Sequence, residues 1–179
     1  MTATRSEFAH PVRVDRLGAT PVDVVLEPDR AVRSALAERF DLVELPHLRA
    51  ELTLRRRPET GWIEVSGNIA ADVVQTCVVT TDPVPGSVRA ELLELFDDSA
   101  GSDDEEVILD PMTDAPEPLA GETLDVGEIV AQTLGLALDP YPRTPGAELA
   151  EMAAEPEGPA AGSPFAELAA LKRRPVKKG

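Results

Sequence analysis

The feature that most constrains the fold of this 179-residue chain is a stretch, residues 47 to 96, in which apolar and polar residues alternate. Alternation with a period of two is typical of β-strands, because successive side chains point to opposite faces of a sheet. In the first segment one parity is apolar and the other polar: Leu48, Ala50, Leu52 and Leu54 against Arg49, Glu51, Thr53 and Arg55. Turn signals at PETG and PVPGS divide the stretch into three. The pattern predicts an antiparallel meander of three long strands with one buried face.

Two segments with helical periodicity flank this meander. Residues 30 to 40 place apolar side chains at i, i+3, i+4 and i+8, directly after Asp29, a good N-cap residue. Residues 126 to 138 follow Asp125, and Glu128 three residues later gives the pattern of a capping box. We therefore predict an α+β fold, in which an antiparallel β-sheet (a meander, partly barrel-like) is packed by two helices.

The composition changes on both sides of the second helix. Residues 97 to 122 are rich in Asp, Glu, Pro and Gly, which predicts a mostly mobile acidic loop in which only VILDPM can pack. Residues 147 to 162 predict a linker of Ala, Pro, Glu and Gly, and residues 163 to 179 a basic amphipathic C-terminal tail. We expect three parts: an α+β domain over residues 1 to 146, this linker and this tail.

The chain is expected to be cytoplasmic and to have no membrane partner. The start, MTATRSEFAHPVRV, has no apolar run of signal-peptide length. No segment approaches the roughly 20 consecutive apolar residues that cross a bilayer. A single cysteine cannot form an intramolecular disulfide, which suits a reducing compartment.

That cysteine, Cys77, lies in VVQTCVVTTDPVPG, and its parity places it on the apolar face of the sheet. A nucleophilic cysteine needs a base, and the chain offers only His10 and His47, neither of which the sequence places near the thiol. A zinc site generally needs four ligands at characteristic spacings, and the chain has no C-x-x-C and no H-x-x-x-H. We interpret Cys77 as a buried structural residue and expect no metal and no cofactor.

Other catalytic patterns are missing as well. The sequence has no P-loop, no dinucleotide fingerprint and no G-x-S-x-G. The acidic run from Asp103 to Glu106 lacks the alternating oxygens and central glycine of a calcium loop, and is typical of hydrated carboxylates. We therefore expect no enzyme and no catalytic residues.

The charge distribution is more informative. The formal net charge is -16, and between Arg89 and Arg143 fifteen Asp and Glu stand without a single Lys or Arg. Such a surface disfavours nucleic acid and favours basic partners. This stretch is either a solubilising loop or a surface that holds a basic protein. The candidate contacts for a basic partner are Asp103, Asp104, Glu105 and Glu106.

Two basic clusters are candidate RNA contacts. The first is LRRRP and a nearby indole, namely Arg55, Arg56, Arg57 and Trp62. The second is the tail, with Lys172, Arg173, Arg174, Lys177 and Lys178. A mobile basic arm can contact phosphate. Both clusters also have simpler interpretations: solvated arginines at a strand end, and a disordered terminus or a charged end that suits a helix dipole.

The stretch from Trp62 to Phe96, an acidic loop and then LDVGEIVAQTLGLALDPYPR together resemble the YceD family of large ribosomal RNA subunit accumulation proteins. The shared elements are a strand glycine, a Cys-x-x-Thr before a Pro-Val turn, a distal helix motif and prolines after that helix: Gly67, Cys77 with Thr80, Pro83 with Val84, Leu124 to Glu128, and Pro140 with Pro142. SPFAELAALKRR resembles the tail of alphaproteobacterial members. The resemblance spans residues 7 to 146 and the last seventeen.

The resemblance implies a non-enzymatic ribosome biogenesis factor that promotes synthesis, processing or stability of large-subunit (23S) ribosomal RNA. Its implied partners are precursor RNA or a basic ribosomal protein, since family genes often neighbour a ribosomal protein gene. Many members carry further cysteines in the first motif and near the final prolines. Here Thr80 and PYPRTPG stand in those places, so the resemblance implies no metal site in this chain.

Two alternatives stay open from the sequence. One is a metal-dependent ribosomal RNA hydrolase, whose ligands would be the carboxylates from Asp103 to Glu106. The other is a generic acidic interaction module that mimics nucleic acid. The sequence does not predict an oligomeric state.

Overall fold

The computed structural model describes residues 6–98, 115–119 and 121–147. In chain order the elements are β1 (Pro11–Arg13), the 3-10 helix η1 (Val14–Arg16), β2 (Val22–Leu26), α1 (Arg30–Arg39), β3 (Glu44–Arg56), β4 (Ile63–Thr76), β5 (Pro83–Asp97), β6 (Glu117–Pro118), β7 (Thr123–Asp125) and α2 (Val126–Ala137). The predicted α+β fold is confirmed. Neither helix in these ranges is long and apolar enough to cross a membrane.

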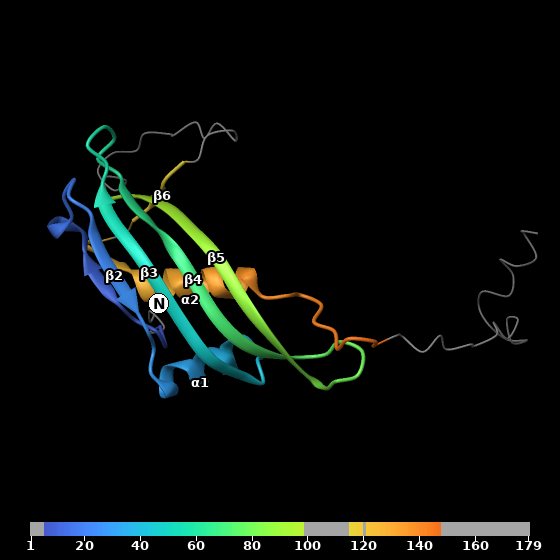
Figure 1. Cartoon of the computed structure of the whole chain (residues 1–179). Coiled ribbons are helices and arrows are strands. Elements are labelled where there is room, and N and C mark those ends of the chain that lie inside the picture. The colour runs from blue at the N-terminus through green and yellow to red at the C-terminus, as the bar shows by residue number, and fades with distance from the viewer. Residues whose placement is uncertain (1–5, 99–114, 120, 148–179) are drawn as a thin grey trace, which may run out of the picture. The chain divides into compact units, whose positions relative to one another are not determined.

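The main sheet has five strands in the order β2-β3-β4-β5-β6, and every neighbouring pair is antiparallel except β5 and β6. The predicted meander is its centre, since β3, β4 and β5 pair along nearly their whole length. The sheet is not closed into a barrel, so the partly barrel-like description is wrong. A separate two-stranded sheet joins β1 to β7. Figure 1 shows α2 crossing one face of the sheet behind β3, β4 and β5, with α1 near the start of β3.

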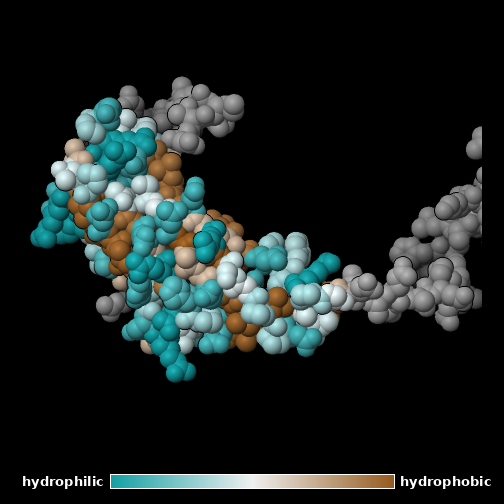
Figure 2. Space-filling model, in the orientation of Figure 1, coloured by the Kyte–Doolittle hydropathy of each residue, from teal (hydrophilic) through white to brown (hydrophobic). Residues whose placement is uncertain are grey.

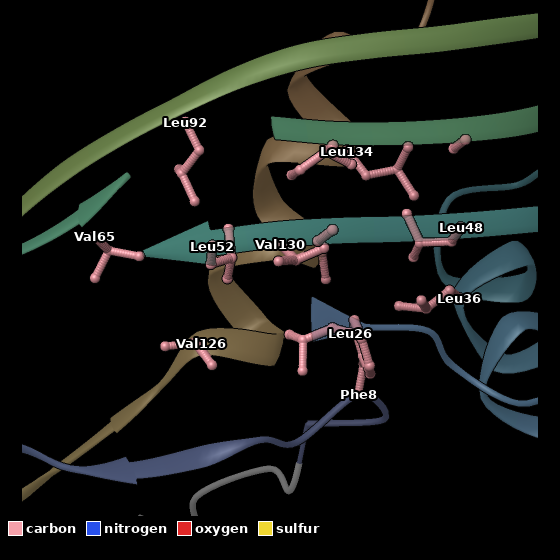
Figure 3. Packing of buried hydrophobic residues seen from close by; sticks show 14 of the residues in the cluster. Phe8, Leu26, Leu36, Leu48, Leu52, Val65, Leu92, Val126, Val130 and Leu134 are labelled. Atoms are coloured by element: carbon pink, nitrogen blue, oxygen red, sulfur yellow. The ribbon is translucent and has the colours of Figure 1, made fainter. Parts of the chain in front are cut away.

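The core lies between that face of the sheet and α2. The alternation of β3 holds, because Leu48, Leu52 and Leu54 are at most 2% exposed. Figure 3 shows side chains from the sheet and from α2 converging on the same interior, among them Leu52, Leu92, Val130 and Leu134. Each fully buried Leu or Val contributes about 1.5–3 kcal/mol relative to an exposed one. The packing of α2 on the meander is therefore the main source of stability.

Gly67 in β4 lies against the backbone of β3 with no room for a side chain. It lies between Leu52 of β3 and Leu92 of β5 in the sheet register. A Cβ atom at this position would lie 2.1 Å from the carbonyl oxygen of Glu51 and 2.9 Å from the Cα of Leu52. No larger residue fits without moving the backbone of β3, so a glycine is required at this position.

Both helices begin at the predicted caps. The carboxylate of Asp29 accepts a hydrogen bond from the amide of Val32, at 2.9 Å. The carboxylate of Asp125 accepts from the amides of Gly127 and Glu128. The capping-box prediction is only half right, because the carboxylate of Glu128 binds the guanidinium of Arg39 rather than turning back to the N-cap.

The pair of Arg39 and Glu128 ties α1 to the first turn of α2. Two nitrogens of Arg39 donate to the two carboxylate oxygens of Glu128, at 2.9 and 2.6 Å. The hydroxyl of Ser6 donates to the same carboxylate at 2.8 Å, and the side-chain amide of Gln132 donates to it at 3.2 Å. The Arg39 guanidinium, then the hydroxyl of Ser6 and the amide of Gln132, lower the pKa of Glu128 to about 2, against the effect of burial. The charged form of Glu128 therefore stabilises the fold.

We predict that Glu128→Gln lowers the free energy of unfolding by about 1–2 kcal/mol at pH 7, because the bidentate pair with Arg39 is partly desolvated. The folded-state pKa of Glu128, about 2, is depressed below the ordinary 4.5. The stabilisation is therefore complete above pH 4.5 and is lost as the pH falls towards 2. Urea denaturation of both proteins at pH 7 and pH 3 measures this difference.

Glu38→Gln is the matched control, because Glu38 is an exposed carboxylate of α1. It should leave the free energy of unfolding within about 0.5 kcal/mol of the wild type. A Glu128→Gln penalty that stayed constant between pH 7 and pH 3 would contradict the role of the charged pair.

Candidate functional site

The end of the β3–β4 hairpin places two arginines around one buried carboxylate. Arg55 lies directly opposite Glu64 in the sheet register, and its Nε donates to a Glu64 oxygen at 2.9 Å. Arg57 donates from its Nε to the other Glu64 oxygen at 2.6 Å. Glu64 is the one buried charged residue in the described part of the chain. The two arginines, Arg55 first, hold its pKa below the ordinary value, while burial opposes them.

Trp62 lies beside this cluster. It pairs with Arg57 across the hairpin, because the Arg57 amide donates to the Trp62 carbonyl oxygen at 2.8 Å. It lies directly before β4, two residues from Glu64 in the chain. Trp62 is partly exposed, and the side chains of Arg55 and Arg57 are 45% and 33% exposed.

We refer to Arg55, Arg57, Trp62 and Glu64 as the arginine–tryptophan cluster. A guanidinium that already holds one carboxylate is fixed in orientation, and its five donors exceed what one carboxylate accepts. A partly exposed indole offers a surface on which an unstacked base can stack. The cluster has the chemistry of a small site for single-stranded nucleic acid or for a phosphate group. Figure 2 shows hydrophilic residues interspersed with apolar ones over the visible face of the molecule.

Arg56 is separated from its two neighbours, since successive residues of a strand face opposite sides. It binds both carboxylate oxygens of Asp98, at 3.0 and 2.7 Å. It also donates to backbone carbonyl oxygens of Val14 at 3.1 Å and of Gly61 at 2.7 Å. The Arg56 guanidinium thus joins η1, the hairpin loop and the end of β5. These hydrogen bonds give Arg56 a structural role.

The remaining candidate residues lie outside the described residues. These are the tail cations Lys172, Arg173, Arg174, Lys177 and Lys178, and the carboxylates Asp103, Asp104, Glu105 and Glu106. The structure does not test them, nor does it test the division into domain, linker and tail. Sequence reasoning missed Glu64. Its parity is opposite to that of Ile63 and Val65, and this position is typical of an ordinary solvent-facing acid. The signal that was available is its place across the hairpin from Arg55 and Arg57.

Cys77 is 1% exposed, so its predicted burial is confirmed. It follows the last residue of β4 and lies in the turn before β5 rather than in the strand. Its sulfur accepts hydrogen bonds from the amides of Thr80 and Thr144, each at 3.4 Å. The amide of Val78 donates to the carbonyl oxygen of Pro142 at 2.9 Å. These bonds fasten the β4–β5 turn to the segment after α2.

The environment of the thiol favours its charged form. Hydrogen bonding by the Thr80 side chain and then by the backbone amides of Thr144 and Thr80 lowers the pKa of Cys77 to about 6, while burial opposes them. The structure thus brings Cys77, Thr80 and Thr144 together, with one sulfur among them. No group of three or more His, Cys, Asp or Glu placed to hold a metal ion occurs within residues 6–98, 115–119 and 121–147.

One family model matches this chain. Its description is "Large ribosomal RNA subunit accumulation protein YceD", and the match covers residues 65–172, more than half of the sequence. The matched range begins inside β4, contains Gly67, the Cys77 turn, β5 and α2, and starts directly after the arginine–tryptophan cluster. No curated protein and no solved structure matches the chain.

We predict that Cys77→Ala lowers the free energy of unfolding by about 1–2 kcal/mol, because it removes the acceptor of two partly buried amide donors. The pKa of Cys77 in the folded state, about 6, is depressed below the ordinary 9.0. The thiolate's contribution is therefore fully present above pH 9 and is lost as the pH falls to 6. The penalty of Cys77→Ala, measured by urea denaturation, should be larger at pH 8.5 than at pH 6.

Val78→Ala is the control, because this neighbouring side chain is 51% exposed. Its effect should be small and equal at both pH values. A Cys77→Ala penalty that shrinks as the pH rises would show that the thiol, and not the thiolate, is the form that the turn stabilises.

Proposed function

Since this chain belongs to the YceD family and thus has a role in the accumulation of large-subunit ribosomal RNA, we propose that it is a non-enzymatic assembly factor. In this proposal it promotes the synthesis, processing or stability of 23S ribosomal RNA by binding the precursor RNA, a basic ribosomal protein, or both. It acts in the cytoplasm, where bacterial ribosomal RNA is made, and has no membrane partner.

The observation that carries the RNA contact is the arginine–tryptophan cluster. Two guanidiniums are ordered by one buried carboxylate, and the backbone of Arg57 pairs with that of Trp62, which is partly exposed. The cluster carries a charge of about +1, because Glu64 neutralises one of the two arginines. Its role in the proposal is to fix the position of a single-stranded segment, with phosphate on the arginines and a base on Trp62.

A cluster of this size cannot hold RNA alone on a chain whose formal net charge is -16. The five tail cations from Lys172 to Lys178 supply the missing attraction in the proposal, and Arg56 contributes by holding the hairpin in place. The run from Asp103 to Glu106 serves the basic ribosomal protein. Both interactions depend on charge and therefore weaken as salt rises.

We predict that replacing the cluster by neutral residues weakens RNA binding. The variant Arg55→Gln/Arg57→Gln/Glu64→Gln removes the buried charge together with its partners, so that no unpaired carboxylate is left inside. Loss of the cluster's net charge of about +1 should lower the slope of log affinity against log salt by about 0.7. Trp62→Ala should weaken binding roughly ten-fold through lost stacking. Fluorescence anisotropy of the full chain with a labelled single-stranded precursor segment measures both.

Two controls separate recognition from stability. Glu64→Gln alone frees the arginines and should maintain or strengthen RNA binding while it lowers the free energy of unfolding. Arg49→Gln changes an arginine on the same face of β3, paired with Glu27 and Glu51 away from the cluster, and should leave the slope unchanged. Equal affinity of the wild type and the triple variant would refute the proposed contact. Cleavage of the RNA by the purified protein with magnesium would favour the hydrolase instead.

A further inference from the structure

Strand β5 leaves one side of its backbone unpaired within the described part of the chain. Its other side pairs with β4 from Pro83 to Asp97. On the open side only Phe96 and Asp97 are paired, by the short strand β6. Pro83 and Pro85 limit the open stretch at its other end, the start of β5, because proline has no amide hydrogen to donate. Residues 86–95 thus form a long edge, and an exposed edge of this kind is a template for another strand.

The direction of the backbone groups on this edge follows from one hydrogen bond. The amide of Leu119 donates to the carbonyl oxygen of Asp97 at 2.9 Å, so Asp97 directs its carbonyl group to the open side. Backbone groups alternate in direction from one residue to the next along a strand. The outward-directed residues are therefore Ser87, Arg89, Glu91, Leu93 and Leu95.

The charges on this edge are self-complementary. Arg89 and Glu91 flank the small residue Ala90, and both are exposed. Neither forms an ion pair with another described residue. Antiparallel pairing with a second copy, centred on Ala90, sets Arg89 opposite the partner's Glu91 and Glu91 opposite the partner's Arg89. The same register sets Val88 opposite the partner's Leu92 on the core side.

We propose that the β5 edge is the interface of a two-fold symmetric dimer of this chain, in which two β5 strands pair about Ala90 and join two five-stranded sheets. In this register residues 86–94 of one strand lie opposite residues 94–86 of the other, so it uses all of the available edge except Leu95. A symmetric interface is self-complementary by necessity, and this one satisfies both charges. A basic peptide on the same edge would bring its cations against Arg89, so a second copy fits better.

Exposed apolar side chains near this edge also favour a second copy of the chain as the partner. Leu93 on the solvent face is 63% exposed and Leu136 near the end of α2 is 89% exposed. A surface hollow of about 150 Å³ beside the edge is lined by residues of both elements, including Phe96, Ile129 and Leu136. Pairing of the strands about Ala90 removes part of the surface of Leu93, three residues from the two-fold axis, from contact with water.

Sedimentation equilibrium of the full chain tests the proposal. The wild type should sediment with twice the 19.1 kDa mass of one chain. Arg89→Glu and Glu91→Arg should each raise the dimer dissociation constant on the order of ten-fold, because two attractive cross-strand pairs become repulsive. The double variant Arg89→Glu/Glu91→Arg restores both pairs and should return the dissociation constant towards the wild-type value.

Arg30→Glu on α1 reverses one charge away from the edge and should leave the dissociation constant unchanged. Circular dichroism confirms that each variant is folded. A wild type that stays monomeric up to about 100 μM, a concentration at which any moderately stable dimer forms, would overturn the proposal. A partner other than a second copy of the chain would then cover this edge. A dimer that neither single reversal weakens would overturn it too, since its interface would lie elsewhere.

Discussion

The burial of one face of the β3–β5 meander under α2 is the contact on which the rest of this structure depends. Without α2, Leu52, Leu92 and their neighbours would face water, and the sheet would have no core. The polar ties are arranged around that contact. Arg39 and Glu128 fix the first turn of α2 against α1, and the Cys77 turn fastens the segment that follows the helix. The pKa of Glu128 and the pKa of Cys77 are both lowered, so the stabilisation by these two ties increases when the acids are ionised.

A sheet that buries one face must present the other to solvent, and the candidate site follows from this division. Arg55 in β3 and Arg57 directly after it lie on the solvent side. Both form ion pairs with Glu64 across the hairpin. Alternation along β3 sends Arg56 to the opposite side, where it clamps Asp98. Three consecutive arginines therefore divide into two that can meet a ligand and one that holds the hairpin. The open edge of β5 is the second consequence, because within the described residues the meander ends there and only the short β6 continues it.

The local sequence pattern was enough to predict the meander, both helices and their N-caps, because periodicity and capping depend on residues that are close together in the chain. It did not predict the pairing of β1 with β7, the parallel strand β6 or the bond from Arg39 to Glu128, because these join residues far apart in the chain. The partly barrel-like description failed for the same reason: whether the edge strands of a sheet meet is a matter of twist and long-range pairing. The arginines were treated as one cluster, although the period of two that defined their strand already separates Arg56 from the other two.

The most direct test of the central claim, a role in large-subunit ribosomal RNA accumulation through direct binding, is a pull-down from the source cells. It compares the full chain with a version ending at Ser163, at low and at high salt, sequencing bound RNA and identifying bound proteins. The account predicts large-subunit precursor RNA or basic ribosomal proteins with the full chain, loss at high salt, and weaker capture by the shortened chain. Capture free of ribosomal components at both salt concentrations would contradict it.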